Sequence, residues 1–315
     1  MRYSGIGGQA VMEGVMMKNQ DKYAVAVRKP DHEIVVEVSE YDGIIQNKKI
    51  RNFPILRGVF SFIESLTLGM KTLMFSASFF EEEDEKKPGE KDKEKSKEKE
   101  AKQTASEKAM MGGTVVFSVL MAIFIFMLIP YYISLFFQKI TDSQMLIALI
   151  EGILRLAIFI GYVAVISLME DIRRVFMYHG AEHKCINCIE HGMDLTVENV
   201  RKSSKQHKRC GTSFLLIVMI VSIFFFMFIR VDSRVLRLVL RLVLIPVIAG
   251  VSYEFIRLAG RSDNAVVNFL SKPGLWLQNL TTKEPDDEMI EVGIASVEAV
   301  FDWRSYVTEI RQEGK

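Results

Sequence analysis

Four of the five histidines and all three cysteines of this chain lie between His179 and Cys210. Imidazole and thiolate groups are the side chains that bind zinc and iron most often. The stretch also lies between two strongly apolar segments of the sequence. This density of ligand-type residues predicts a metal site beside a membrane, and any chemistry of the protein is expected there.

His179 and His183 are four residues apart, so on a helix both imidazoles leave the same face and can reach one divalent ion, zinc or iron. Glu182 is the candidate catalytic base for a water activated at that ion. The pattern His-x-x-Glu-His is also that of the inverted zinc proteases, which take a further ligand downstream. The candidates for completing the ligand set are His207 and Cys210, which we favour, and Glu190 and Glu254.

The same stretch has two other interpretations. Cys185 and Cys188, paired with His207 and Cys210, have the spacing of the knuckles in a structural zinc site. Such a site has four protein ligands and would hold the fold of the loop without catalysing anything. In the third interpretation no metal binds, the histidines hydrogen-bond at the membrane surface, and the thiols pack as small apolar groups.

The apolar residues predict four membrane segments, at residues 113–137, 145–169, 213–229 and 236–258. A bilayer core of about 30 Å needs roughly 20 helical residues, and the third segment is short for this. Pro130 is expected to kink the first segment. Glu151 and Arg155 lie four apart in the second segment, and we expect them to form a structural ion pair.

The distribution of Lys and Arg predicts the orientation in the membrane. The loop at residues 170–212 is rich in both, whereas the turn at 138–144 carries Lys139 alone. The positive-inside rule therefore places that loop and both termini in the cytoplasm. Four arginines around the turn between the third and fourth segments disagree with this topology: Arg230, Arg234, Arg237 and Arg241.

Residues 1–80 are expected to form a cytoplasmic region. Residues 5–14 are glycine-rich and predict a tight exposed loop, which either folds over the metal site with Glu13 or is a structural turn. Two β-branched runs at 23–27 and 33–38 flank a turn and predict a β-hairpin. Residues 54–80 mix apolar and charged residues, as in a helix that lies in the membrane interface or packs on the helix bundle.

The two remaining regions are polar or mixed. Residues 81–108 consist almost entirely of Glu, Lys and Asp and predict a charged, disordered linker. Residues 259–315 are expected to form a cytoplasmic tail. It contains an amphipathic helix that begins near Glu284 and carries an apolar stripe for docking, made of Ile290, Ile294, Val297 and Phe301.

Composition limits the class of protein. The net charge of +1 by itself predicts nothing about nucleic acid, because the charges are segregated along the chain. No basic stripe with interleaved aromatics occurs, so we expect no nucleic-acid partner. Three cysteines do not suit a disulfide framework, and the N-terminus lacks the apolar stretch of a signal peptide. The expected fold is a mainly α membrane protein. It has about four transmembrane helices and a small α+β cytoplasmic domain made of the N-terminal hairpin, the His/Cys-rich loop at 170–212 and the C-terminal amphipathic helix.

Several motifs together resemble the YqhQ family, bacterial multi-pass membrane proteins of unknown function. They are residues 7–17 (GGQAVMEGVMM), 178–184 (YHGAEHK) with 195–200 (LTVENV), 207–214 (HKRCGTSF), 253–257 (YEFIR), 273–278 (PGLWLQ) and 284–288 (EPDDE). The resemblance implies a metal-dependent enzyme in a bacterial plasma membrane. It also implies that Cys185 lies outside the shared motif, unlike His179, Glu182, His183, His207 and Cys210, which weighs against the knuckle interpretation.

These observations favour metal-assisted hydrolysis at the cytoplasmic face of the inner membrane, on a lipid-linked or membrane-protein substrate. The competing hypothesis is a non-enzymatic membrane scaffold or assembly factor in which any metal is structural. A transporter ranks lower, because the predicted spans carry few polar residues and no internal repeat is evident.

Overall fold

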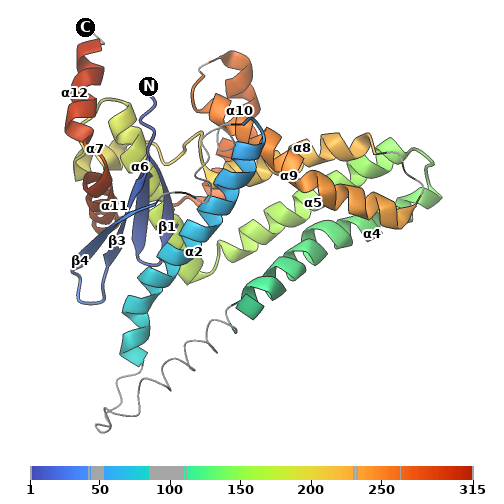
Figure 1. Cartoon of the computed structure of the whole chain (residues 1–315), viewed down its shortest axis with the longest axis horizontal. Helices are drawn as coiled ribbons and strands as arrows, with labels where there is room; N and C mark the ends of the chain where they lie inside the picture. The colour runs from blue at the N-terminus through green and yellow to red at the C-terminus, as the bar shows by residue number, and fades with distance from the viewer. Residues whose placement is uncertain are drawn as a thin grey trace.

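The computed structural model describes residues 2–41, 43, 53–84, 110, 112–229, 231, 233–262 and 264–313. These residues form a mainly helical structure with one small sheet, and the sheet and the long helices lie at opposite ends of the molecule (Figure 1). The elements are β1 (Gly7–Val11), β2 (Gly14–Asn19), β3 (Lys22–Arg28), β4 (Ile34–Glu40), α2 (Leu56–Asp84), η1 (Phe124–Leu128), α4 (Ile129–Phe136), η2 (Phe137–Lys139), α5 (Gln144–Ile166), α6 (Glu170–Glu190), α7 (Val197–Lys202), α8 (Gly211–Met227), α9 (Arg234–Ala259), α10 (Ala265–Thr281), α11 (Asp287–Val300) and α12 (Trp303–Glu313).

The described residues include a four-stranded antiparallel sheet in the order β1-β2-β3-β4. Strands β3 and β4 confirm the predicted hairpin. The prediction of an exposed loop at residues 5–14 is wrong, because β1 pairs with β2 and Gly8 lies opposite Met17. Glu13 takes the left-handed backbone conformation, with φ +48°, in the tight turn between these strands. The glycine-rich segment is therefore half of a second hairpin.

Helices cover both faces of the sheet. Val15 and Met17 of β2 pack in one apolar cluster with α6 and α11, whereas Met16 between them packs in a second cluster with Leu68 of α2. Alternate residues of a strand point to opposite faces. This two-sided cover explains why β2 begins with four consecutive buried residues, Gly14, Val15, Met16 and Met17.

Helix α2 connects the sheet to the long helices. Its C-terminal half packs on the sheet, and its first turn lies against α9, where Arg57 forms an ion pair with Glu254. A helix is present where one was predicted at 54–80, and its place in the membrane interface stays a prediction. It continues as far as Asp84, into the region predicted to be a linker, and residues 85–109 lie outside the described part of the chain.

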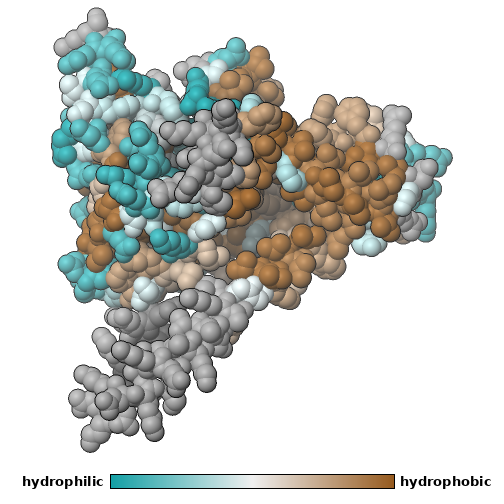
Figure 2. Space-filling model, in the orientation of Figure 1, coloured by the Kyte–Doolittle hydropathy of each residue, from teal (hydrophilic) through white to brown (hydrophobic). Residues whose placement is uncertain are grey.

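Three helices in the described part are long and apolar enough to cross a membrane: Gly112–Lys139, Gln144–Ile166 and Val235–Ala259. Helix α8 is equally apolar but has 17 residues, so a count of four spans stays a prediction. Figure 2 shows hydrophobic surface gathered over these helices and hydrophilic surface at the sheet end of the molecule. This segregation is expected of a protein whose helices lie in lipid.

The expected ion pair between Glu151 and Arg155 is present, with 2.8 Å between Oε1 and Nη2. Arg241 of α9 joins it through a second contact to the same oxygen, at 2.6 Å. One of the four arginines that disagree with the predicted topology therefore pairs inside the helix bundle.

The C-terminal tail contains further helices besides the single amphipathic helix that was predicted. Helix α11 confirms the predicted helix, and Ile290 and Val297 of its stripe are buried against α6 and the sheet. The side chain of Asp286 caps its first turn by accepting from the Met289 amide at 2.8 Å. Helices α10 and α12 add two elements that the sequence patterns did not indicate.

Candidate metal centre

Helix α6 carries the two histidines of the expected site. Glu170 and Asp171 lie in its first turn, where carboxylates stabilise a helix N-terminus. His179 and His183 project from the same face, and their ring centroids are 4.4 Å apart. The predicted helical pairing of these imidazoles is confirmed.

Cys210 brings the third ligand-type atom to the same place. It caps the N-terminus of α8, and its Sγ lies 3.4 Å from Nε2 of His179. The ligand atoms of His179, His183 and Cys210 all lie within 4.8 Å of one another. A tetrahedral zinc ion with usual bond lengths separates a nitrogen and a sulfur ligand by roughly 3.5 Å. The His179–Cys210 spacing already fits such an ion.

Hydrogen bonds fix the orientation of both imidazoles. Nδ1 of His179 lies 2.9 Å from the carbonyl oxygen of Thr281, and Nδ1 of His183 lies 2.7 Å from that of Lys205. A carbonyl oxygen can only accept, so each Nδ1 carries a proton, and Nε2 is the ring nitrogen that would bind an ion after losing any proton of its own. Metal-binding histidines usually have this arrangement, in which a backbone carbonyl or a carboxylate holds the outer nitrogen.

Two polar residues of α6 shape the loop that leads to Cys210. Lys184 donates to the carbonyl oxygens of Arg201 and Ser203, both at 2.9 Å. Asn187 donates to those of Ser204, at 2.6 Å, and Gln206, at 2.9 Å. Both side chains are buried, so these bonds satisfy loop carbonyls that would otherwise lack partners. Their spacing on α6, at i and i+3, was a sequence signal that these two side chains lie on one face of the helix.

Glu182 lies beside the three ligands. It is 5% exposed, and its Oε2 is 3.9 Å from Nε2 of His179. Burial raises the pKa of this carboxyl, and the facing imidazoles and the Gly8 amide, which donates to it, counter only part of that rise. A Cβ on Gly8 would lie 2.8 Å from Cγ of Glu182, so the glycine is what lets β1 approach so closely.

The glycine-rich N-terminus therefore meets the site, but as a strand and not as a lid. Glu13 lies away from the three ligands: its carboxylate binds the guanidinium of Arg174, and it accepts from the Tyr178 hydroxyl at 3.2 Å. Glu13 supplies no carboxylate to the centre in this arrangement.

The electrostatics of the site favour a thiolate. Burial alone would raise the pKa of the Cys210 thiol, but the imidazoles of His179 and His183 outweigh it and hold that pKa well below its usual range. Burial also opposes the charged form of His179, yet Cys210 raises the pKa of that imidazole to about 9. A thiolate beside two oriented imidazoles is a strong donor set for a soft or borderline divalent ion.

His207 lies next to this group without joining it. Its ring is 5.7 Å from that of His183 between centroids, but its Nδ1 accepts from the Arg209 amide at 3.4 Å. Its Nε2 then carries the proton and donates to Glu190 at 3.4 Å. Both ring nitrogens are engaged, so His207 presents no free lone pair to the centre.

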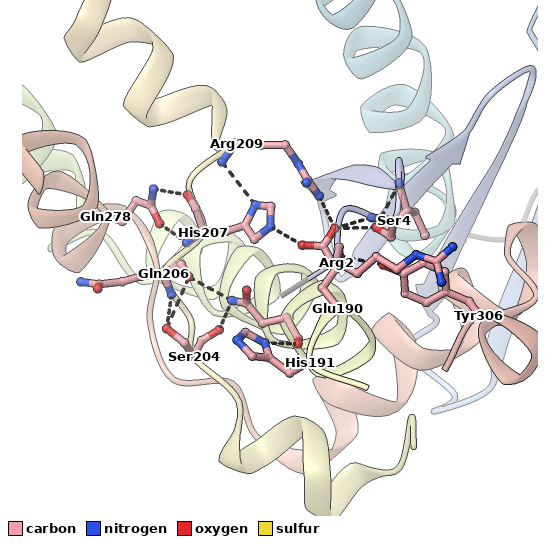
Figure 3. Close-up of polar contacts among 12 residues, drawn as sticks. Arg2, Ser4, Glu190, His191, Ser204, Gln206, His207, Arg209, Gln278 and Tyr306 are labelled. Atoms are coloured by element: carbon pink, nitrogen blue, oxygen red, sulfur yellow. Dashed lines mark hydrogen bonds and ion pairs between the residues drawn. The ribbon is translucent and has the colours of Figure 1, made fainter. Parts of the chain in front are cut away.

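Figure 3 shows the network that holds His207. The Glu190 carboxylate is fully buried and also binds Nη2 of Arg209 at 2.6 Å and the hydroxyl of Ser4 at 2.7 Å. Burial alone would raise the pKa of Glu190, but the hydrogen bond from His207 and the charge of Arg209 bring it to about 2. From the other side, Gln278 of α10 bonds to both the amide and the carbonyl of His207, each at 2.8 Å.

Sequence reasoning placed Glu190 among the ligand candidates and gave no role to Ser4 or Gln278. Their function in the structure is to hold the segment between His207 and Cys210. Ser4 carries no sequence signal for this role. Gln278 is the last residue of the motif at 273–278, on which the family resemblance partly rests. That motif was the sequence signal that Gln278 has a role.

The four-ligand knuckle is not assembled. The thiol of Cys188 donates to the carbonyl of Asp194 at 3.4 Å, and Cys185 packs against Gly293 of α11. Burial raises the pKa of the Cys185 thiol well above its usual range. The last alternative ligand, Glu254, pairs with Arg57 on α2. Within the described residues, the group of ligand-type side chains close enough to share an ion is His179, His183 and Cys210.

Fold and site together define a class: a helical protein with helices long and apolar enough to cross a membrane, a small sheet domain, and a buried His–His–Cys cluster between them. The chain belongs to the family described as "Protein of unknown function (DUF1385)", which it matches over residues 53–303. It is 36% identical to the "Uncharacterized protein YqhQ" of Bacillus subtilis (strain 168), over 92% of this chain and 90% of that protein. No solved structure matches it.

Proposed function

We propose that this protein is a metal-dependent enzyme of the bacterial inner membrane. In the proposal His179, His183 and Cys210 hold a zinc or iron ion at the cytoplasmic face, and four helices including α8 cross the bilayer. The reaction is hydrolysis of a membrane-associated substrate, lipid-linked or protein. The bound ion would supply a Lewis acid that polarises the substrate and makes a water molecule more acidic.

The observation that carries the proposal is the orientation of the ligand set. Both imidazoles give their outer N–H to backbone carbonyls, at 2.9 and 2.7 Å, and turn the inner nitrogen toward Cys210. Catalytic zinc sites have three protein ligands and keep a fourth position open, whereas structural sites have four. Three ligands with one adjacent carboxyl therefore favour a catalytic centre over a structural one.

Glu182 is the proposed general base. Its carboxyl is close enough to the three ligands to take a proton from a water held among them, and its position is fixed by the Gly8 amide. His207 is not a ligand in this proposal. Instead, Glu190 binds the His207 ring and Gln278 binds its backbone, and these contacts position the segment from His207 to Cys210.

The membrane placement rests on the long apolar helices and on the Lys- and Arg-rich 170–212 region. The centre lies where α6 meets the start of α8, at one end of the apolar bundle. A substrate embedded in the bilayer could present its polar group there without leaving the membrane.

A chromosomal Glu182→Gln substitution tests the catalytic role in the native bacterium. We expect the variant protein to keep its metal while the cells accumulate the same uncleaved lipid or membrane protein as a deletion strain, measured by mass spectrometry of membranes. Glu198→Gln, on the exposed surface of α7, is the matched control. Wild-type membrane composition in the Glu182→Gln strain would reject catalysis.

The competing scaffold function predicts a different pattern. A scaffold would tolerate Glu182→Gln, because the carboxyl is buried and offers nothing to a partner. It would instead lose one stoichiometric partner when Glu288 and Glu291, exposed acidic residues of α11, are both replaced by lysine. Retention of all partners in that double variant, in a protein that still inserts in the membrane, argues against a scaffold that uses this face of α11.

A further inference from the structure

A second cluster of charged residues lies inside the helix bundle, apart from the metal centre. Glu151, Arg155 and Arg241 are each at most 7% exposed, and the two guanidiniums share Oε1 of the glutamate. Arg155 also donates to Ser222 of α8 at 3.0 Å. The cluster joins α5, α8 and α9, and ionisable residues inside membrane-type helices are costly and mark function by default.

A break in the first long helix serves this cluster. Pro130 has no amide hydrogen and cannot bond the carbonyl of Phe126, four residues earlier. The helix passes through a π-turn, η1, at this point, and Nε of Arg155 donates to the freed Phe126 carbonyl at 3.0 Å. All three nitrogens of Arg155 are thereby satisfied. Turns of this kind are frequent at functional sites.

Arg241 is less completely partnered. Its guanidinium lies 5.1 Å from the ring centroids of both Tyr131 and Phe226, and one terminal nitrogen binds Glu151. Its Nε, the Tyr131 hydroxyl and Oε2 of Glu151 are buried and have no hydrogen-bond partner among the described residues. Buried polar atoms usually have a hydrogen-bond partner, and a small polar species would supply one to these three.

The charge of the cluster identifies the species. Two guanidiniums face one carboxylate, so the cluster carries one surplus positive charge. A neighbouring arginine of α9, Arg237, donates twice to the Val231 carbonyl, and no carboxylate among the described residues pairs with it. Two of the unsatisfied atoms, Nε of Arg241 and the Tyr131 hydroxyl, are donors. A surplus positive charge with free donors suits an anion.

We propose that Arg241 and Tyr131, backed by Arg155, bind one small monovalent anion of the chloride class inside the bundle. One such anion makes the cluster neutral and takes up both free donors. A water molecule hydrating the same anion would satisfy Oε2 of Glu151. The near-complete burial of these side chains selects against a phosphate or carboxylate ligand with a bulky substituent. The proposal is independent of the metal centre, since none of its residues belongs to that centre.

The test is ³⁶Cl⁻ binding to the full-length protein in nanodiscs of zwitterionic lipid, in gluconate buffer. Wild type should bind chloride saturably, about one ion per chain. Tyr131→Phe removes one donor and should weaken binding about tenfold or more, the usual cost of losing a hydrogen bond to a charged group. Tyr132→Phe is the matched control, because that neighbouring tyrosine is 64% exposed, and it should bind like wild type.

A second variant should change the chloride affinity in the opposite direction. Glu151→Gln raises the charge of the cluster by one, so a variant that stays folded should bind chloride more tightly than wild type. Absence of saturable binding in wild type overturns the proposal. Equal affinities in Tyr131→Phe and Tyr132→Phe overturn it as well, whatever Glu151→Gln does.

Discussion

Glu190→Gln should destabilise the protein strongly, although residue 190 is not a metal ligand in our proposal. The wild-type carboxylate is fully buried and binds Arg209, His207 and Ser4. Its pKa falls from 4.5 to about 2, and at about 1.4 kcal/mol per pKa unit this corresponds to roughly 3 kcal/mol of stability. Removing one partner from a buried ionic network costs a similar amount, about 3–5 kcal/mol.

The stability that Glu190 contributes should decrease as the pH falls. The pKa of Glu190 is depressed in the folded state, so its contribution is complete above about pH 4.5 and is lost as the pH falls toward about 2. Wild type should therefore lose stability across that window, while Glu190→Gln should lack this component of the loss.

Thermal unfolding in detergent, recorded by intrinsic fluorescence from pH 7 to pH 3, measures both effects. At pH 7 we expect Tm to fall by about 6–12 °C in Glu190→Gln, since roughly 3 kcal/mol is lost and 1 kcal/mol shifts Tm by about 2–4 °C in domains of 150–250 residues. Glu198→Gln, a fully exposed glutamate paired with Lys202, should leave Tm nearly unchanged. A Glu190→Gln protein with wild-type Tm and the wild-type slope in acid would refute the electrostatic reasoning.

Three further substitutions test separate parts of the site. Gly8→Ala should weaken metal binding and lower Tm, because the added Cβ would lie 2.6 Å from the Met16 carbonyl oxygen and 2.8 Å from Cγ of Glu182. The control is Gly7→Ala, whose Cβ would meet nothing within 4 Å. It should match wild type in both metal binding and Tm. Gln278→Ala removes both hydrogen bonds to the His207 backbone and should weaken metal binding, measured by equilibrium competition with a zinc chelator. Unchanged affinity would show that α10 does not position the segment from His207 to Cys210. Asp286→Ala removes the cap of α11 and should cost about 1 kcal/mol in chemical unfolding, while Asp286→Asn should cost little; equal losses in the two would exclude capping as the cause.

The parts of the fold that the sequence predicts are those with a strong local pattern. The hairpin of β3 and β4 follows from two β-branched runs around a turn, and α11 follows from its apolar stripe and acidic first turn. The pairing of His179 with His183 needs only the helical repeat. In each case neighbours in sequence determine the geometry.

The parts that the sequence does not predict depend on contacts between distant segments. Strand β1 is glycine-rich and weak by propensity, and it forms because β2 pairs with it and α6 packs on it. Helix α10 contains Pro273 and Gly274, which normally interrupt a helix, and Gly274 lies tightly against Ser213 of α8. That Cys210 rather than His207 groups with His179 and His183 depends on Glu190, which binds the His207 ring from 17 residues away, and no local spacing reveals it.

The most direct test of the proposed centre is metal content by mass spectrometry of the purified protein in three forms: wild type, His179→Ala and Cys185→Ser. Cys185 is the matched control, because it is a buried thiol on the same helix whose side chain packs against α11, away from the three ligands. We predict one zinc or iron per chain in wild type and in Cys185→Ser, and none in His179→Ala. A folded wild type without metal, or loss of metal in Cys185→Ser alone, would contradict the His179–His183–Cys210 centre.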